Sequence, residues 1–190
     1  FRSGKGIILK PSSAASSMGA HAGAALACGW GAELCSNPGS AKPRAGFLLE
    51  VADCPAFWAS KLQPAAAAST MEAECAALSM PLRAAIPLLD LARQAARGLK
   101  ASGSRSLAFQ AAAHEGSQGA LKLASLEEGR STPRSKFYAL RLHWLRPWLH
   151  RPSGGISTEF IDTKMQKAGM LTKALARGPF RGSRMLSMGW

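Results

Sequence analysis

Acidic residues are scarce in this sequence. Its 190 residues include 11 Asp and Glu against 24 Lys and Arg, which gives a formal net charge of +13. No acidic residue precedes Glu33, and the aspartates are Asp53, Asp90 and Asp162 alone. Few carboxylates therefore remain to build a metal-dependent active site. The excess of base favours a polyanionic partner, with nucleic acid first, although a merely solvated basic surface explains the same charge.

Three other features are missing. The cysteines show no CxxC spacing and support neither a zinc ribbon nor a disulfide framework, so we expect small buried hydrophobes at Cys28, Cys35, Cys54 and Cys75. No apolar run approaches the roughly 18 residues of a membrane helix, so no membrane partner is expected. The first residues lack an initiator Met and resemble no signal peptide. We interpret the chain as a piece of a longer intracellular protein, cytoplasmic or nuclear.

The residues that are present predict a folded domain. Hydrophobic residues make up 47% of the chain, enough for a real core. Residues 45–51 and 56–62 resemble two strands of a hairpin. A capping box at Ser69-Thr70-Met71-Glu72 predicts the start of a helix. Pro81 and Pro87 then predict a kink, or two helices, before Gly98.

The second half of the chain predicts alternating elements. We expect a strand over 106–112, a helix through 120–124, a basic amphipathic helix over 135–150 and a strand over 156–161. A second capping box at Thr163-Lys164-Met165-Gln166 predicts a helix that Gly178-Pro179 ends. Trp144 and Trp148 have helical spacing and fit a core better than a surface for stacking bases. This order indicates an α/β or α+β domain with a mixed sheet.

Several segments resemble, in order, the carboxyl-terminal part of copia-type retrotransposon Pol polyproteins. Residues 54–63 are similar to the family's "CPxxWxSKxQ", and residues 69–78 to its "STxEAEYxAL". Residues 132–136 resemble "xxRSKH", and residues 141–146 resemble "RYHFIR". Residues 162–173 resemble "DTKEQKADIxTK". These motifs belong to the ribonuclease H domain of the polyprotein.

The resemblance implies a fold, an activity and partners. The fold is the α/β ribonuclease H type, with a five-stranded mixed sheet and helices on both faces. The family's activity is cleavage of the RNA strand of an RNA–DNA hybrid, with two Mg²⁺ ions as cofactors. The expected partners are an RNA–DNA hybrid or another nucleic acid and the remainder of the Pol polyprotein, without a small-molecule ligand. Residues 1–18 would belong to a preceding linker, 19–177 to the domain and 178–190 to a carboxyl-terminal tail.

The resemblance also locates the family's metal-binding carboxylates: an Asp on the first strand, a Glu on the first helix, an Asp after the fourth strand and an Asp on the last helix. Glu74 matches the Glu. The first Asp falls on Gly23 in one ungapped register, and within residues 27–29, beginning at Ala27, in another. The third and fourth positions are Gly116 and Gly169. Glu115 should point to the opposite face from residue 116, so we expect no substitution by it.

One family carboxylate of four therefore remains, and a lone Glu does not hold two Mg²⁺ ions. The sequence predicts a decayed ribonuclease H domain without cofactors and without catalysis. The alternative is a non-enzymatic nucleic-acid-binding or structural remnant, and a third hypothesis is a chain that barely folds because its first strand is rich in Gly and Ala. Basic residues matching or flanking the motifs are the candidate phosphate contacts: Lys61, Arg134, Lys136, Arg141, Arg146 and Lys173.

Overall fold

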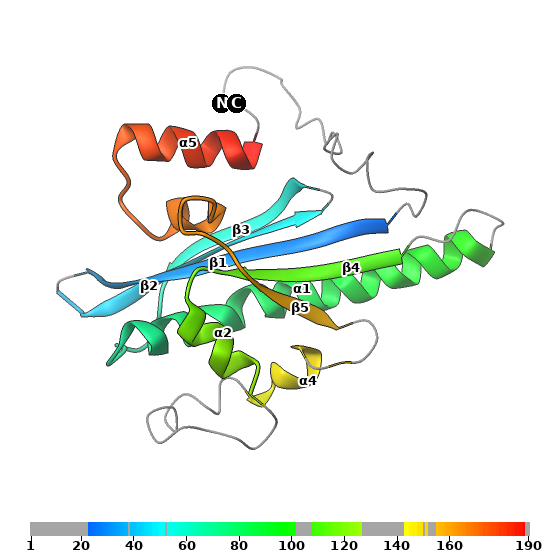
Figure 1. Cartoon of the computed structure of the whole chain (residues 1–190), viewed down its shortest axis with the longest axis horizontal. Coiled ribbons are helices and arrows are strands. Elements are labelled where there is room, and N and C mark those ends of the chain that lie inside the picture. Colours follow the sequence, from blue (N-terminus) through cyan, green and yellow to red (C-terminus); the bar gives the residue numbers. More distant parts are fainter. Residues whose placement is uncertain are drawn as a thin grey trace.

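A computed structural model of the chain describes residues 23–37, 39–51, 53–101, 108–126, 143–149, 151 and 155–188. Figure 1 shows the order and arrangement of the helices and strands. In chain order they are β1 (Gly23–Asn37), β2 (Lys42–Val51), β3 (Cys54–Leu62), α1 (Thr70–Ala101), β4 (Ala108–Glu115), α2 (Gln118–Ala124), α4 (Arg146–Leu149), β5 (Ile156–Phe160), the 3₁₀ helix η2 (Lys167–Leu171) and α5 (Arg177–Met188).

The five strands form one mixed sheet in the order β3-β2-β1-β4-β5. β1, β2 and β3 are antiparallel neighbours, whereas β4 runs parallel to β1 and β5 runs parallel to β4. The Gly- and Ala-rich β1 occupies the centre, where hydrogen bonds to a strand on each side compensate for its weak strand propensity. The predicted five-stranded mixed sheet is confirmed, and so is the hairpin of β2 and β3.

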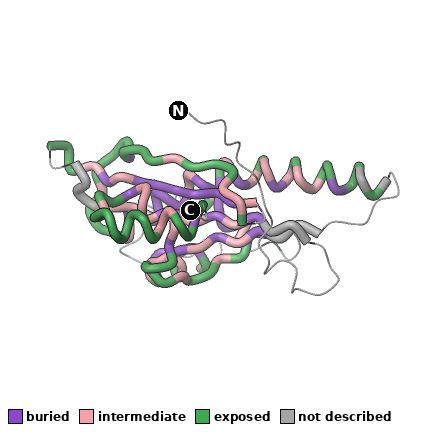
Figure 2. Tube along the Cα trace, turned by 90° about the horizontal axis from the view of Figure 1, so that it is seen from above, coloured by how far each residue is buried: buried purple, intermediate pink, exposed green. Residues whose placement is uncertain are grey.

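Helices cover both faces of the sheet. On one face, Leu26, Cys28 and Trp30 of β1 join a core with residues of α1 such as Leu82 and Leu89. The other face is covered by η2, as shown by Gly46 of β2, where an added Cβ atom would lie 2.8 Å from the Leu171 Cβ atom. Helix α5 lies beside η2 (Figure 1). Figure 2 shows how the buried residues gather along the strands between these layers. The predicted helices on both faces are therefore confirmed.

Helix α1 begins as its capping box predicts. The Ser69 hydroxyl oxygen accepts from the Glu72 N–H at 3.1 Å, and the Glu72 carboxylate accepts from the Ala68 N–H at 2.8 Å. Of the two predicted alternatives, a kink or two helices, the second is excluded, since one helix continues through Pro81 and Pro87 to Ala101. Burial of the apolar face of α1 against the sheet opposes the loss of backbone hydrogen bonds at the two prolines.

The length and hydropathy of α1 also bear on the membrane question. Over Thr70–Gly98 the helix is long and apolar enough to cross a membrane by composition alone, although no uninterrupted apolar run marks it in the sequence. The core helix of a soluble protein passes the same test, and leucines of α1 are buried against the sheet here. The apolar composition of α1 is therefore explained by its place in the core.

The last third of the chain differs from the sequence prediction. No α-helix opens at Thr163: residues 163–165 form a turn in which the Asp162 carboxylate accepts from the Lys164 N–H at 2.8 Å, and η2 follows. Gly178-Pro179 does not end a helix but lies in the first turn of α5. Proline is suited to that turn, because its missing N–H would have no partner within the helix. Residues 178–188 of the expected tail thus belong to a helix beside the sheet (Figure 1).

Replacement by alanine should affect stability differently at two glycines of the sheet. A Cβ atom at Gly46 would lie 2.8 Å from the Leu171 Cβ atom and 2.9 Å from the Thr172 Cγ2 atom. Because η2 would have to move, we expect Gly46→Ala to lower the free energy of unfolding by about 1–3 kcal/mol. Gly31→Ala is the matched control, since nothing lies within 4 Å of its Cβ position. Urea denaturation checks both variants, and equal destabilisation would contradict the packing of η2 on β2.

Candidate functional site

Two carboxylates meet where β1 and β4 lie side by side near the end of β4. Glu115 is the last residue of β4 and pairs with Trp30 of β1. Its side chain is buried, with 1% of the residue exposed. The Glu115 Oε1 atom accepts from the Ser117 N–H at 2.8 Å, and the Ser117 hydroxyl in turn caps α2 through the Ala120 N–H at 3.3 Å. The turn after β4 therefore fixes the Glu115 carboxylate in the interior.

Glu74 reaches the same place from the first turns of α1. Its carboxylate accepts a hydrogen bond from the Ala32 backbone N–H of β1, and its charge acts on Glu115. Glu115 faces the α1 side of the sheet, away from residue 116, as the alternation along β4 predicts. Glu74 approaches on that same side, so the two carboxylates meet there.

Burial dominates the electrostatics of the pair. Loss of hydration raises the pKa of both carboxyl groups, and the neighbouring Glu74 charge raises the pKa of Glu115 further. The Ala32 N–H and the Lys173 ammonium oppose the rise in the pKa of Glu74. Among the described residues, the Oε2 atoms of Glu74 and Glu115 have no hydrogen-bond partner. The pair therefore favours a protonated state, as expected of buried carboxylates with too little positive charge nearby.

Side chains at the start of η2 hold that helix over this end of the sheet. The Gln166 amide donates to the Trp30 carbonyl and to the His114 carbonyl, both at 3.1 Å, and so bridges β1 and β4. The Lys167 ammonium lies 2.7 Å from the Glu50 carboxylate of β2. These contacts place Gly169, two residues further along η2, on the sheet face opposite α1.

Three glycines leave open space on the η2 side of this end. No atom lies within 4 Å of a Cβ atom added to Gly31 or to Gly169. A Cβ atom at Gly116 would lie 3.8 Å from the Ile161 carbonyl oxygen and 3.8 Å from the Thr163 hydroxyl. Each position would therefore accept a Cβ atom without displacing its neighbours.

The structure does not bring Gly23 to this site. Gly23 pairs with Ala108 at the far end of β1, seven residues before Trp30. At roughly 3.3 Å per residue, that separation is about 23 Å. The second register fails as well, because Ala27 pairs with Ala112, three residues before Glu115. The β1 residue beside Glu74 and Gly116 is Gly31, which lies between Trp30 and Ala32.

Sequence reasoning missed Gly31 because the Gly/Ala-rich segment gives no strand boundary. The turn residues Gly39 and Ser40 were the available signal, since a strand that ends just before them brings residues 30–32 into the middle of the sheet. Glu115 was missed because strand alternation says which face a residue is on, but not which helix residue approaches that face.

The candidate phosphate contacts have different outcomes. Lys61 and Lys173 are exposed. The prediction for Arg146 is wrong: 3% of the residue is exposed, and its guanidinium donates to the Leu123 carbonyl at 3.2 Å. Arg134, Lys136 and Arg141 lie outside the described residues.

Two smaller predictions concern apolar packing. Trp144 packs against the core, as predicted, with the Arg83 guanidinium 5.8 Å from the centre of its ring. Trp148 does not join that core: it is half-buried, with the Arg151 guanidinium 4.4 Å from the centre of its ring. Cys28 and Cys75 are buried thiols, and burial raises the pKa of each to about 12. At neutral pH they behave as small hydrophobes.

The residues at this site do not fit a pair of Mg²⁺ ions. Within the described part of the chain, no three His, Cys, Asp or Glu side chains are grouped so that they could hold a metal ion. Mg²⁺ requires oxygen ligands in near-octahedral geometry, and two ions share several carboxylates. Glu74 and Glu115 alone supply too few oxygen ligands for two ions.

Comparison with known proteins gives a structural likeness only. No protein-family model matches the sequence, and no curated protein matches it. Among solved structures, the chain is similar to the N-terminal ribonuclease H domain of a Mycobacterium tuberculosis protein, determined as a fusion with maltose-binding protein. The TM-score is 0.47 at 13% sequence identity, over 85% of this chain and 97% of that chain.

Proposed function

We propose that the chain is the ribonuclease H-like domain of a copia-type retrotransposon polyprotein, that it has lost hybrid cleavage, and that it retains nucleic-acid binding. One observation carries the proposal. At the end of β1 and β4 the Glu74 carboxylate accepts from the Ala32 N–H, while Gly31, Gly116 and Gly169 at this end carry no side chain, although a Cβ atom would fit at each. The shared order of the family-like motifs supports the same origin.

The loss of cleavage follows from charge. Two-metal hydrolysis needs carboxylates that hold both ions, so that one ion activates water and the other stabilises the leaving oxygen. Here burial raises the pKa values of Glu74 and Glu115, so the site disfavours the ionised form of the two carboxyl groups that it has. Glycine at the other positions offers no ligand. The chain's own residues therefore position two carboxyl groups but do not provide the charge that two cations require.

Binding outlasts catalysis in this proposal because the basic residues do not depend on the missing carboxylates. The net charge of +13 favours phosphate contacts. Lys173 is exposed and lies close enough to Glu74 to influence the pKa of that carboxyl group, so it is a phosphate contact at the site itself. Lys61 is the other exposed candidate, and the partners expected here are an RNA–DNA hybrid and the rest of the polyprotein.

Salt dependence of hybrid binding tests this proposal. We expect affinity for a fluorescent RNA–DNA hybrid to fall steeply with salt, and Lys173→Ala and Lys61→Ala each to reduce the log–log slope by about 1. Lys122→Ala, an exposed lysine of α2 outside the proposed contacts, is the matched control. Fluorescence anisotropy measures all four proteins. Absence of binding at low salt, or equal slopes in all variants, would contradict the retained interface.

A further inference from the structure

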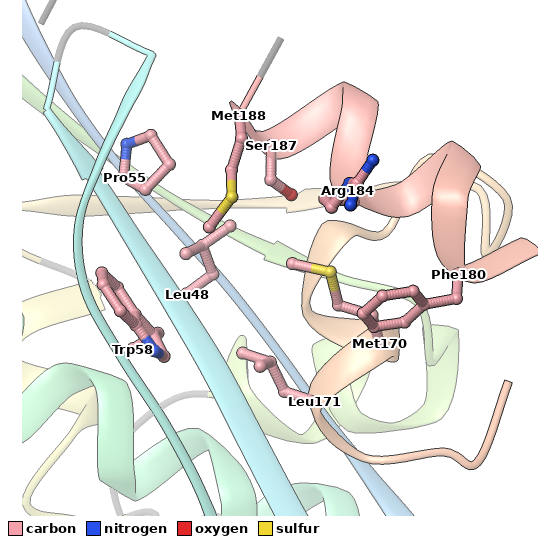
Figure 3. Close-up of a pocket in the computed structure, with 9 residues that line it drawn as sticks. All are labelled: Leu48, Pro55, Trp58, Met170, Leu171, Phe180, Arg184, Ser187 and Met188. Atoms are coloured by element: carbon pink, nitrogen blue, oxygen red, sulfur yellow. The ribbon is translucent and has the colours of Figure 1, made fainter. Parts of the chain in front are cut away.

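An apolar groove runs between the edge of the sheet and α5. Its floor is formed by Leu48 of β2 and Trp58 of β3, its end by Leu171 of η2, and its far wall by Phe180 and Met188 of α5. Figure 3 shows these side chains turned toward a common space, with Trp58 on one side and α5 on the other. The groove lies beside η2, on the sheet face away from α1.

The groove is large enough for one ring or branched side chain. Its volume is about 190 Å³, which exceeds the ~150 Å³ of an apolar protein cavity that admits benzene. Trp58 is 48% exposed and Phe180 is 45% exposed, although both are large hydrophobic residues. A partner that covers them removes this apolar surface from water, which is the main source of affinity in such contacts.

The α5 side of the groove carries positive charge only. The charged residues of α5 are Arg177, Arg181 and Arg184, and the helix has no acidic residue. In Figure 3 the Arg184 guanidinium lies on the side of its chain away from Trp58, so it faces the rim rather than the apolar floor. The acidic residues next to the lining residue Pro55 are Asp53, in the turn before it, and Glu50, which pairs with it across the sheet and whose carboxylate lies 2.7 Å from the Lys167 ammonium. Complementary charge on a partner would therefore lie along α5.

We propose that this groove binds an acidic peptide segment, which inserts one aromatic or branched aliphatic side chain between Trp58 and Phe180 and places its carboxylates along the arginines of α5. The lining favours a side chain over a nucleic-acid base. Of its nine residues, two are polar, Arg184 and Ser187. A base inserted there would leave donors and acceptors of its edge without partners, and buried unpaired polar groups are costly.

A pair of synthetic peptides tests the groove directly. The first has a single Phe flanked by Asp and Glu, and the second has Ala in place of Phe. With fluorescein-labelled peptides in anisotropy titrations, we expect the Phe peptide to bind roughly 10- to 100-fold more tightly than the Ala peptide, because of the apolar surface that the ring buries. A third peptide with Lys in place of the acids should bind no better than the Ala peptide.

Variants locate the binding. Trp58→Ala and Arg184→Glu should each weaken binding of the Phe peptide, whereas Leu91→Ala, at an exposed position on α1, should not. Circular dichroism confirms that each variant is folded. Equal affinity for the Phe and Ala peptides, or no binding of the Phe peptide at all, would overturn the proposal. So would displacement of the bound peptide by a single-stranded oligonucleotide of equal charge, which would assign the groove to nucleic acid. The peptide-binding results do not depend on whether the chain cleaves an RNA–DNA hybrid or binds one in a salt-dependent way.

Discussion

The triple variant Gly31→Asp, Gly116→Asp, Gly169→Asp should cleave the RNA strand of an RNA–DNA hybrid in the presence of Mg²⁺. All three positions lie at the same end of the sheet as Glu74, and a Cβ atom at each would clash with no neighbour. Three added carboxylates would complete a ligand set for two metal ions. Enzymes accelerate reactions by roughly 10⁶-fold or more, so a site restored to about a thousandth of that efficiency would still be measured easily on a gel.

Two control variants distinguish the effect of where the carboxylates lie from the effect of the added negative charge. Gly23→Asp in place of Gly31→Asp adds the same charge, but about 23 Å from the site at ~3.3 Å per strand residue, so it should give no cleavage. Adding Glu74→Gln to the active triple variant should abolish cleavage, because the one original ligand is lost. A folded triple variant that binds the hybrid without cleaving it would show that this end of the sheet does not form a metal site.

The free energy of unfolding should fall as the pH rises from about 5 to about 8. Burial raises the pKa of Glu74 to about 7 and, together with the Glu74 charge, that of Glu115 to about 8, against 4.5 for an ordinary Glu. Between these values the folded state holds protons that the unfolded state has released. The stability from the neutral carboxyls is therefore complete below pH 4.5 and is lost as the pH passes the folded-state values. A carboxyl pKa that is one pH unit higher in the folded state corresponds to about 1.4 kcal/mol, so the loss amounts to a few kcal/mol.

Glu115→Gln isolates this effect. The amide is close in shape to the protonated carboxyl and its oxygen still accepts from the Ser117 N–H. We expect the variant to match the wild type at pH 5 and to be more stable at pH 8 by about 1–3 kcal/mol. Glu159→Gln, at a position whose side chain is 55% exposed, serves as the control. Urea denaturation at both pH values measures the free energy of unfolding of each protein. A Glu115→Gln protein whose stability depends on pH as that of the wild type does would show that Glu115 does not have a raised pKa in the folded state.

Local signals in the sequence predicted much of the sheet and the start of α1. The hairpin of β2 and β3 follows from two apolar runs around a short turn, and the Ser69 capping box defines a helix start through hydrogen bonds within four residues. Such features depend on neighbouring residues, so they can be recognised without tertiary structure.

The remaining errors have tertiary causes. Pro81 and Pro87 do not divide α1, because the energy of packing against the sheet outweighs local preference. The Thr163 box does not start an α-helix, since Gln166 and Lys167 are instead committed to contacts with β1, β4 and β2. No local pattern records contacts between residues that are 52 to 136 positions apart.

The same distinction explains which site residues could be predicted. Glu74, Gly116 and Gly169 follow from motifs, and the structure places them around the end of β1 and β4. The position on β1 depends on strand register, which Gly and Ala residues leave unspecified, so Gly23 was wrong and Gly31 emerged only from the pairing of Trp30 with Glu115. Burial of Arg146 likewise depends on its contact with the distant Leu123 carbonyl.

The loss of cleavage is tested most simply by the nuclease activity of the unaltered chain. A hybrid with a 5′-labelled RNA strand is incubated with purified protein and Mg²⁺, and with EDTA as the blank. We predict binding of the hybrid and no cleavage above the blank. Mg²⁺-dependent cleavage that Glu74→Gln abolishes would show that the chain is an active nuclease, since the carboxylates present would then suffice for the chemistry.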